Sequence, residues 1–124
     1  MKLVSKTIGQ CLKDTAQNYG NCTALENEEW NCSYAELDMI TDLLAGIINK
    51  RWRIYKGTHV GIWSLNTPNY VFMYMALAKI GAIACVLNTY LKTEEISNML
   101  NQADVEILFY GIGCKDVIYD NLTH

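Results

Sequence analysis

Polar residues that could bind a ligand follow three apolar segments of this sequence. They are Asn66 and Thr67 after HVGIWSL, then Asn88, Thr89 and Tyr90 after IACVL, and Gly111 and Gly113 after VEILFY. If these segments are neighbouring strands of an open parallel sheet, the residues lie at its carboxyl edge, where such sheets bind ligands. The same residue types also suit a helix cap and ordinary turns, and this structural interpretation is the simpler one.

The other chemically capable residues do not form a catalytic constellation. Gly111-Ile112-Gly113 begins like a dinucleotide fingerprint, but Asp116 takes the place of the third glycine. The sequence contains no glycine-rich phosphate loop ending in Lys-Ser/Thr and no G-x-S-x-G elbow. The adjacent acids at 28–29 and 94–95 diverge in any strand or helix, and His59 has no nucleophile near it in sequence. We therefore predict no catalytic, cofactor-binding or metal-binding residue in this chain.

The composition narrows the class of protein. Of the 124 residues, 51% are hydrophobic and 19% are charged, which is the balance of a globular domain. The net charge is −3, and the densest basic stretch, 50–56, suits the C-terminal end of a helix better than a phosphate site. We therefore expect no nucleic-acid partner. Five dispersed cysteines without a C-x-x-C pair argue against zinc and indicate reduced thiols, so we expect a cytoplasmic protein.

The first half of the chain predicts a helix, a hairpin and a second helix. Thr7 and Gln10 fit a capping box at the start of a helix that Gly20 ends. The short runs CTALE and EWNCS then suit a β-hairpin. Ser33 and Glu36 form a second capping-box pattern, which opens a longer helix. The apolar stripe of that helix consists of Leu37, Ile40, Leu44, Ile47 and Ile48.

The second half alternates strands with helices. Strands are expected near 59–65, 83–88 and 105–110, with helices between them that begin at Pro68 and Thr93. This alternation with short connections predicts right-handed crossovers and a parallel sheet. The fold class is therefore α/β, with three layers and a parallel βαβαβ core preceded by a helix and a β-hairpin. We expect residues 1–124 to form a single α/β unit without an internal linker.

The longest apolar run, YVFMYMALAKIGAIACVLN, extends from Tyr70 to Asn88 and raises the question of a membrane span. A span needs about 20 apolar residues without a central charge. Lys79 lies near the middle of the run, and a charge at the bilayer centre costs roughly 2.5–3.5 kcal/mol. A helix ending at Ile80, a turn at Gly81 and a strand from Ile83 avoid that cost, with Lys79 reaching water from the helix end. We therefore predict no transmembrane segment.

The order of these segments resembles the N-terminal portion of the adenylate-forming acid–CoA ligases, the acyl-CoA synthetase family. The similar stretches are TIGQCLKDTAQNYGN, WNCSYAELDMITDLLAGI, KGTHVGIWSLNTPNYVFMYMALAKIGAIACVLN and EEISNMLNQADVEILFY. They extend from Thr7 to about Tyr110, and TIGQCL and VGIWSLN look most like medium- to long-chain fatty acyl-CoA synthetases. Departures from the family's usual residues fall at turns, namely Gly20-Asn21, Thr58 and Thr89.

The resemblance implies a function for a longer parent enzyme. Such an enzyme activates a fatty acid with ATP and Mg²⁺, forms an acyl-adenylate, and transfers the acyl group to CoA. The family's Ser/Thr/Gly-rich phosphate loop ends in Pro-Lys-Gly, whereas the single proline here, Pro68, precedes Asn69. The later catalytic segments are absent as well. The resemblance therefore implies an N-terminal structural part that binds the rest of the parent enzyme, holds no cofactor itself and is inactive in isolation.

Two other functions are compatible with the sequence. The first is a stand-alone, non-enzymatic α/β interaction module, which would bury its apolar surface. A part of a larger sheet would instead expose an apolar edge and self-associate. The second is a small flavodoxin-like domain that binds a nucleotide or a flavin. That domain needs loops that hold phosphate, but the loop Asn66-Thr67-Pro68 has no glycine.

Overall fold

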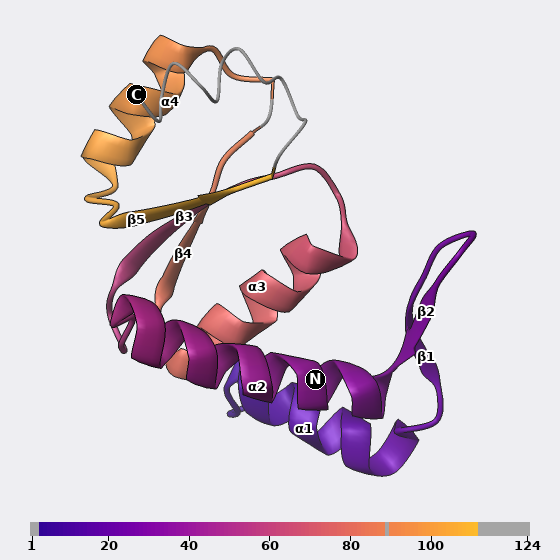
Figure 1. Ribbon diagram of the computed structural model, residues 1–124. Coiled ribbons are helices and arrows are strands. Elements are labelled where there is room, and N and C mark those ends of the chain that lie inside the picture. The colour runs from indigo at the N-terminus through magenta and orange to yellow at the C-terminus, as the bar shows by residue number, and fades with distance from the viewer. Residues whose placement is uncertain (1–2, 89, 112–124) are drawn as a thin grey trace.

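The computed structural model describes residues 3–88 and 90–111 of the chain and has the predicted α/β architecture (Figure 1). A helix and a two-stranded hairpin precede a longer helix, and strands and helices then alternate. The elements are α1 (Ile8–Tyr19), β1 (Thr23–Glu26), β2 (Asn31–Ser33), α2 (Tyr34–Trp52), β3 (His59–Trp63), α3 (Pro68–Ile80), β4 (Ile83–Val86), α4 (Thr93–Gln102) and β5 (Ile107–Tyr110).

The main sheet is parallel, as the alternation of elements predicts. Its strand order is β4-β3-β5, so β3 is central. Val60 pairs with Ala84 on one side and with Ile107 on the other. The strands are shorter than the sequence suggests, partly because Val105 donates its N–H to Leu100 O at the end of α4 and so precedes β5. The predicted βαβαβ core is confirmed.

Helices cover both faces of β3, which gives the three layers. Val60 and Ile62 are buried in a cluster with Ile48 of α2 and Leu77 of α3. On the opposite face, Trp63 packs with residues of α4. Because successive strand residues point to opposite faces, a strand buried on both sides must be apolar throughout. This explains the unbroken apolar run in HVGIW.

Gly61 allows α4 to pack closely on its face of the sheet. A Cβ atom at this position would lie 3.0 Å from Leu108 Cδ1, 3.2 Å from Val105 Cγ1 and 3.3 Å from Leu100 Cδ2. These separations are tighter than ordinary van der Waals contact. The space that a side chain at Gly61 would occupy is therefore filled by the side chains of these three residues.

Helix α3 is the apolar helix that the long run predicted. Thr67 caps its start, Pro68 occupies its first turn, and Gly81 ends it with φ = 85°. The chain then enters β4 at Ile83. No helix in the described ranges 3–88 and 90–111 is long and apolar enough to cross a bilayer. The run is therefore a helix-to-strand junction inside the fold, as expected.

The caps of the first two helices differ from each other. Ser33 and Glu36 form the complete capping box at the start of α2, as predicted. At α1 the Thr7 hydroxyl accepts a hydrogen bond from Gln10 N, while the Gln10 side chain donates to Asp14. Lys50 and Arg51 of the 50–56 stretch do lie in the last turn of α2, where positive charge complements the helix dipole.

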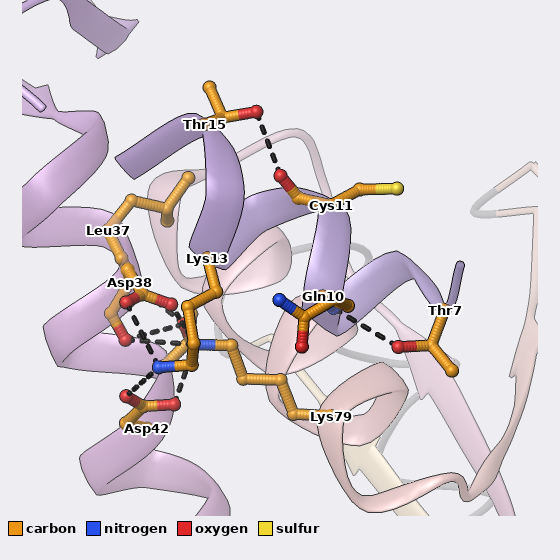
Figure 2. Close-up of polar contacts among 10 residues, drawn as sticks. Thr7, Gln10, Cys11, Lys13, Thr15, Leu37, Asp38, Asp42 and Lys79 are labelled. Carbon is orange, nitrogen blue, oxygen red and sulfur yellow. Dashed lines mark hydrogen bonds and ion pairs between the residues drawn. The ribbon is translucent and has the colours of Figure 1, made fainter. Parts of the chain in front are cut away.

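Four charged side chains join the three helices α1, α2 and α3 (Figure 2). Lys79 Nζ of α3 donates to Asp38 Oδ1 at 2.6 Å, to Asp42 Oδ1 at 2.7 Å and to the Asp38 carbonyl at 3.0 Å. Lys13 of α1 bonds to the second oxygen of each carboxylate, at 3.4 Å and 3.2 Å. Each aspartate of α2 therefore bridges a lysine from each neighbouring helix.

The expectation that Lys79 reaches water is wrong. Its side chain is 9% exposed and ends between two carboxylates. Gly9 of α1 makes this possible, since a Cβ there would lie only 3.1 Å from Lys79 Cγ and 3.4 Å from its Cα. The charge that excludes a membrane span thus serves to hold α3 against α1 and α2.

The ion-pair cluster shifts the titration of its members. The Lys79 ammonium, through its hydrogen bond, is the main reason that the pKa of the Asp42 carboxyl lies below its usual 3.8, and Lys13 adds to the effect. Hydrogen bonds to Asp42 and Asp38 raise the pKa of Lys13 above its usual 10.5. Both pKa shifts favour the charged, paired forms of Asp42 and Lys13 at pH values between 3.8 and 10.5.

Replacing Lys79 by methionine tests whether the cluster stabilises the fold. The Asp38 carboxylate is 15% exposed and would lose its nearest cation, so Lys79→Met should lower the free energy of unfolding by about 2–3 kcal/mol. Urea denaturation followed by circular dichroism measures this. Lys6→Met, which removes the exposed Lys6–Asp14 pair, is the control and should change little. Equal effects of the two variants would contradict the proposed role of the cluster.

The cluster also predicts how stability depends on acid. Because the folded pKa of Asp42 is depressed, its contribution is complete above the unfolded value near 3.8 and is lost as pH falls through the folded pKa. In Asp42→Asn, the free energy of unfolding should fall less steeply with decreasing pH below 3.8 than in the wild type. The free energy of unfolding of this variant should still depend on pH, because Lys6 lowers the pKa of Asp14 in the folded state as well. An unchanged slope in urea titrations at several pH values would refute the assignment.

Candidate functional site

The carboxyl edge of the sheet brings Gly111 against the residue that follows β3. Gly111 N donates to Trp63 O at 2.9 Å, and a Cβ at Gly111 would lie 2.9 Å from Ser64 Oγ. A side chain at Gly111 would therefore force Ser64 to move. Ser64 is therefore also part of this edge, although no sequence pattern distinguished it. Its hydroxyl donates locally to the Leu65 carbonyl.

Asn88 adopts the turn role that was the simpler interpretation of its sequence. Its Oδ1 accepts from Tyr90 N at 2.9 Å, and its carbonyl accepts from Leu91 N at 3.2 Å. Tyr90 is 83% exposed beyond this turn. The two other candidates at this edge, Thr89 and Gly113, lie outside the described residues.

Asn66 and Thr67 line a cleft between the start of α3 and the β1–β2 hairpin. The cleft has a volume of about 330 Å³. The Thr67 hydroxyl accepts from Tyr70 N at 3.3 Å, which is the helix cap that the simpler interpretation predicted. The residues that line the cleft are Leu25, Glu26, Asn27, Trp30, Asn66, Thr67, Pro68, Tyr70 and Val71.

The hairpin wall of this cleft could not be foreseen from the sequence. Trp30 packs edge-on against Phe72 of α3, with ring centroids 5.8 Å apart, and this contact holds the hairpin over the helix start. The lining has one acid, Glu26, and no lysine or arginine among the described residues. The cleft therefore suits an apolar or neutral polar group better than a phosphate.

The remaining candidate residues have structural partners. His59 Nδ1 lies 2.6 Å from the Ala103 carbonyl, so the ring ties the start of β3 to the end of α4. Within the described ranges, no group of three or more His, Cys, Asp or Glu side chains is arranged to hold a metal. Cys32 is buried, and burial raises the pKa of its thiol. Cys11 and Cys22 are exposed and free.

Comparison with protein families gives the decisive observation. The model of the family described as "AMP-binding enzyme" matches residues 12–122. The chain belongs to the AMP-binding enzyme family. The resemblance noted in the sequence is thereby confirmed.

Two curated relatives illustrate the similarity. YngI of Bacillus subtilis, which carries an acyl-CoA synthetase name, is 34% identical over 99% of this chain. The mitochondrial medium-chain acyl-CoA ligase ACSF2 of Rattus norvegicus is 30% identical over 94% of it. The match covers 23% of YngI and 18% of ACSF2, so the chain spans about a fifth of the length of these AMP-binding relatives.

Two solved structures share the fold of this chain. The N-terminal domain of FACL13 from Mycobacterium tuberculosis superposes with a TM-score of 0.88 at 23% identity, over 95% of this chain and 30% of that one. The N-terminal subdomain of NpsA from Klebsiella oxytoca gives 0.84 at 21% identity, over 96% and 34%. The chain therefore shares the α/β class and the parallel sheet of these two N-terminal domains.

Thr67→Ala tests whether this residue of the cleft is a helix cap. The loss of the hydroxyl leaves Tyr70 N with the Thr67 carbonyl, at 3.1 Å, as its remaining acceptor, so the free energy of unfolding should fall by about 1 kcal/mol. Thr67→Ser keeps an acceptor and should behave like the wild type in the same urea titration. If alanine and serine variants are equally stable, the capping role is wrong.

Proposed function

We propose that this chain is the N-terminal structural part of an ATP-dependent fatty acid–CoA ligase and has no ligase activity by itself. The observation that carries the proposal is the match of residues 12–122 to the AMP-binding enzyme family. The names of its relatives YngI and ACSF2 supply the acid–CoA ligase activity. The resemblance of TIGQCL and VGIWSLN to medium- to long-chain fatty acyl-CoA synthetases indicates that the acid substrate is a fatty acid.

The role that we assign to the chain is scaffolding. Ser64, Asn88 and Gly111 are held at the carboxyl edge of the sheet by backbone bonds and turns, and they offer no acid, base or nucleophile apart from the Ser64 hydroxyl. In an open parallel sheet this edge faces the ligand site. The chain would therefore form one wall beside the nucleotide and acyl sites of the whole enzyme.

The cofactors of the reaction would be held elsewhere in that enzyme. ATP needs cationic or glycine-rich contacts to its phosphates, and Mg²⁺ needs carboxylate ligands. Neither the cleft nor the carboxyl edge offers a lysine, an arginine or an acidic cluster within the described residues. The residues present thus do not fit ATP or Mg²⁺ on their own, and we assign no step of catalysis to them.

Exposed apolar residues support a partner surface on the sheet. Ile83 and Val86 of the edge strand β4 are each 45% exposed, and Tyr110 of the other edge strand β5 is 44% exposed. A stand-alone module would cover such strand edges or make them polar. We propose that the rest of the ligase continues the sheet there.

We further propose that residues 1–124 behave as one unit in a reducing compartment such as the cytoplasm. The ion-pair cluster joins α1, α2 and α3, and α3 in turn packs on the sheet, which supports a single unit. Four cysteines, Cys11, Cys22, Cys32 and Cys85, are free, which agrees with reducing conditions.

Pyrophosphate exchange with ATP and a panel of fatty acids tests the proposal. The purified chain should show no exchange above background, because it lacks the phosphate loop, while circular dichroism shows that it is folded. The chain should also bind a dye for apolar surface. Robust exchange by the chain alone would overturn the proposal.

The same preparation separates the alternative functions. A monomer that binds no dye would favour a stand-alone interaction module. Saturable binding of AMP or FMN next to Asn66 would favour a small nucleotide- or flavin-binding domain.

A further inference from the structure

Helix α2 carries an apolar stripe on its outer surface. Met39, Leu43 and Ile47 follow one another at intervals of one helical turn and are 56%, 63% and 53% exposed. The sequence pattern had placed both Ile47 and Ile48 in the apolar stripe of the helix, and of these two Ile48 is buried whereas Ile47 is exposed. Helix α2 packs with α3 on the face of the sheet opposite α4 (Figure 1). This stripe is therefore an unpartnered helix face within the described structure.

An apolar groove runs beside the stripe. It has a volume of about 410 Å³ and lies between α2 and the first half of α3. All but one of its lining residues are apolar: Ile40, Leu43, Leu44, Ile47, Asn69, Phe72 and Met73. An apolar side chain of another molecule could fill this groove, which would remove its own surface and that of the groove from water.

The residues of this face are arranged symmetrically about Leu43. Met39 precedes Leu43 by as many positions as Ile47 follows it. At the ends of the same face, Glu36 and Lys50 are equally far from Leu43, and both are exposed. When two copies of such a helix pack antiparallel with Leu43 against Leu43, an acid therefore meets a base at each end.

We propose that this face binds a second copy of the chain, with α2 packed antiparallel against α2 about a two-fold axis at Leu43. Glu36 of each copy then pairs with Lys50 of the other, and the apolar stripe occupies the centre. A two-fold interface requires such a self-complementary surface. The Glu36 side chain uses Oε1 to accept from Ser33 N, and its other oxygen is available for the pair.

Gly46 helps the two helices to approach. It lies on the exposed side of α2, and a Cβ there would have no atom within 4 Å. In the antiparallel pair Gly46 comes to nearly the same height as Met39 of the second copy, and it leaves room for that long side chain. Small residues at a helix–helix contact shorten the distance between axes.

A second copy fits this face better than the rest of a ligase does. A larger sheet would continue at β4 or β5, whereas α2 packs on one face of the sheet and its stripe is exposed away from the strands. The mirrored order of acid, apolar stripe and base around Leu43 is what an antiparallel pairing of the helix with itself requires. The inference is independent of the proposed ligase function.

Sedimentation velocity over roughly 10 to 200 µM chain tests the dimer, because one helix pair is smaller than a standard interface and should associate weakly. The wild type should shift from monomer to dimer. Leu43→Glu places two carboxylates together at the axis and should weaken dimerisation roughly tenfold or more. Gln17→Glu adds the same charge on α1, and Met99→Glu removes an exposed apolar residue of α4; both should dimerise like the wild type.

Charge variants test the antiparallel geometry itself. Lys50→Glu alone sets acid against acid, and Glu36→Lys alone sets base against base, so each should dimerise more weakly than the wild type at low salt. A mixture of the two variants restores both opposite-charge pairs and should form heterodimers. Circular dichroism verifies that every variant is folded.

Three outcomes would overturn the proposal. One is a wild-type chain that stays monomeric over the whole concentration range. Another is a dimer that Met99→Glu weakens as much as Leu43→Glu does, which would indicate non-specific apolar association. The third is a mixture of the two charge variants that associates no better than each variant alone.

Discussion

Strand β3 must be covered on both faces, and this requirement determines where the two neighbouring strands and the helices α3 and α4 lie. Val60 and Ile62 face α2 and α3, while Trp63 faces α4, and all three are buried. Both edges of β3 pair with parallel strands. Parallel pairing needs a crossover for each neighbour, so α3 and α4 are at once the connections and the covering layers. The carboxyl edge with Ser64 and Gly111 follows from the same arrangement.

The outer helices are fixed by a different interaction, the burial of the Lys79 ammonium between Asp38 and Asp42. A helix as apolar as α3 can be buried on most sides only if its single charge finds partners. The two carboxylates come from one face of α2, and Lys13 supplies a compensating charge from α1. The cluster thereby joins the N-terminal helix to the βαβ core, which the periodicity of the sequence gives no reason to expect.

Local signals in the sequence predicted the elements well. The Ser33–Glu36 box, the Thr67-Pro68 helix start and the Gly81 end depend on neighbouring residues only, so their patterns suffice. Contacts between distant segments could not be predicted in this way. Lys79 was expected in water, and the Trp30–Phe72 contact that forms the cleft joins segments whose relative positions no periodicity encodes. The candidate site was predicted as turns and caps, and Asn88 and Thr67 have those roles.

We propose that the chain supplies structure to an adenylate-forming ligase whose chemistry lies in other segments. Grafting the chain in place of the matching part of rat ACSF2 tests this most directly, with formation of medium-chain acyl-CoA as the readout. If the chain has this structural role, the folded chimaera should regain ligase activity that the rest of ACSF2 lacks by itself. A folded chimaera with no more activity than that remainder would contradict it.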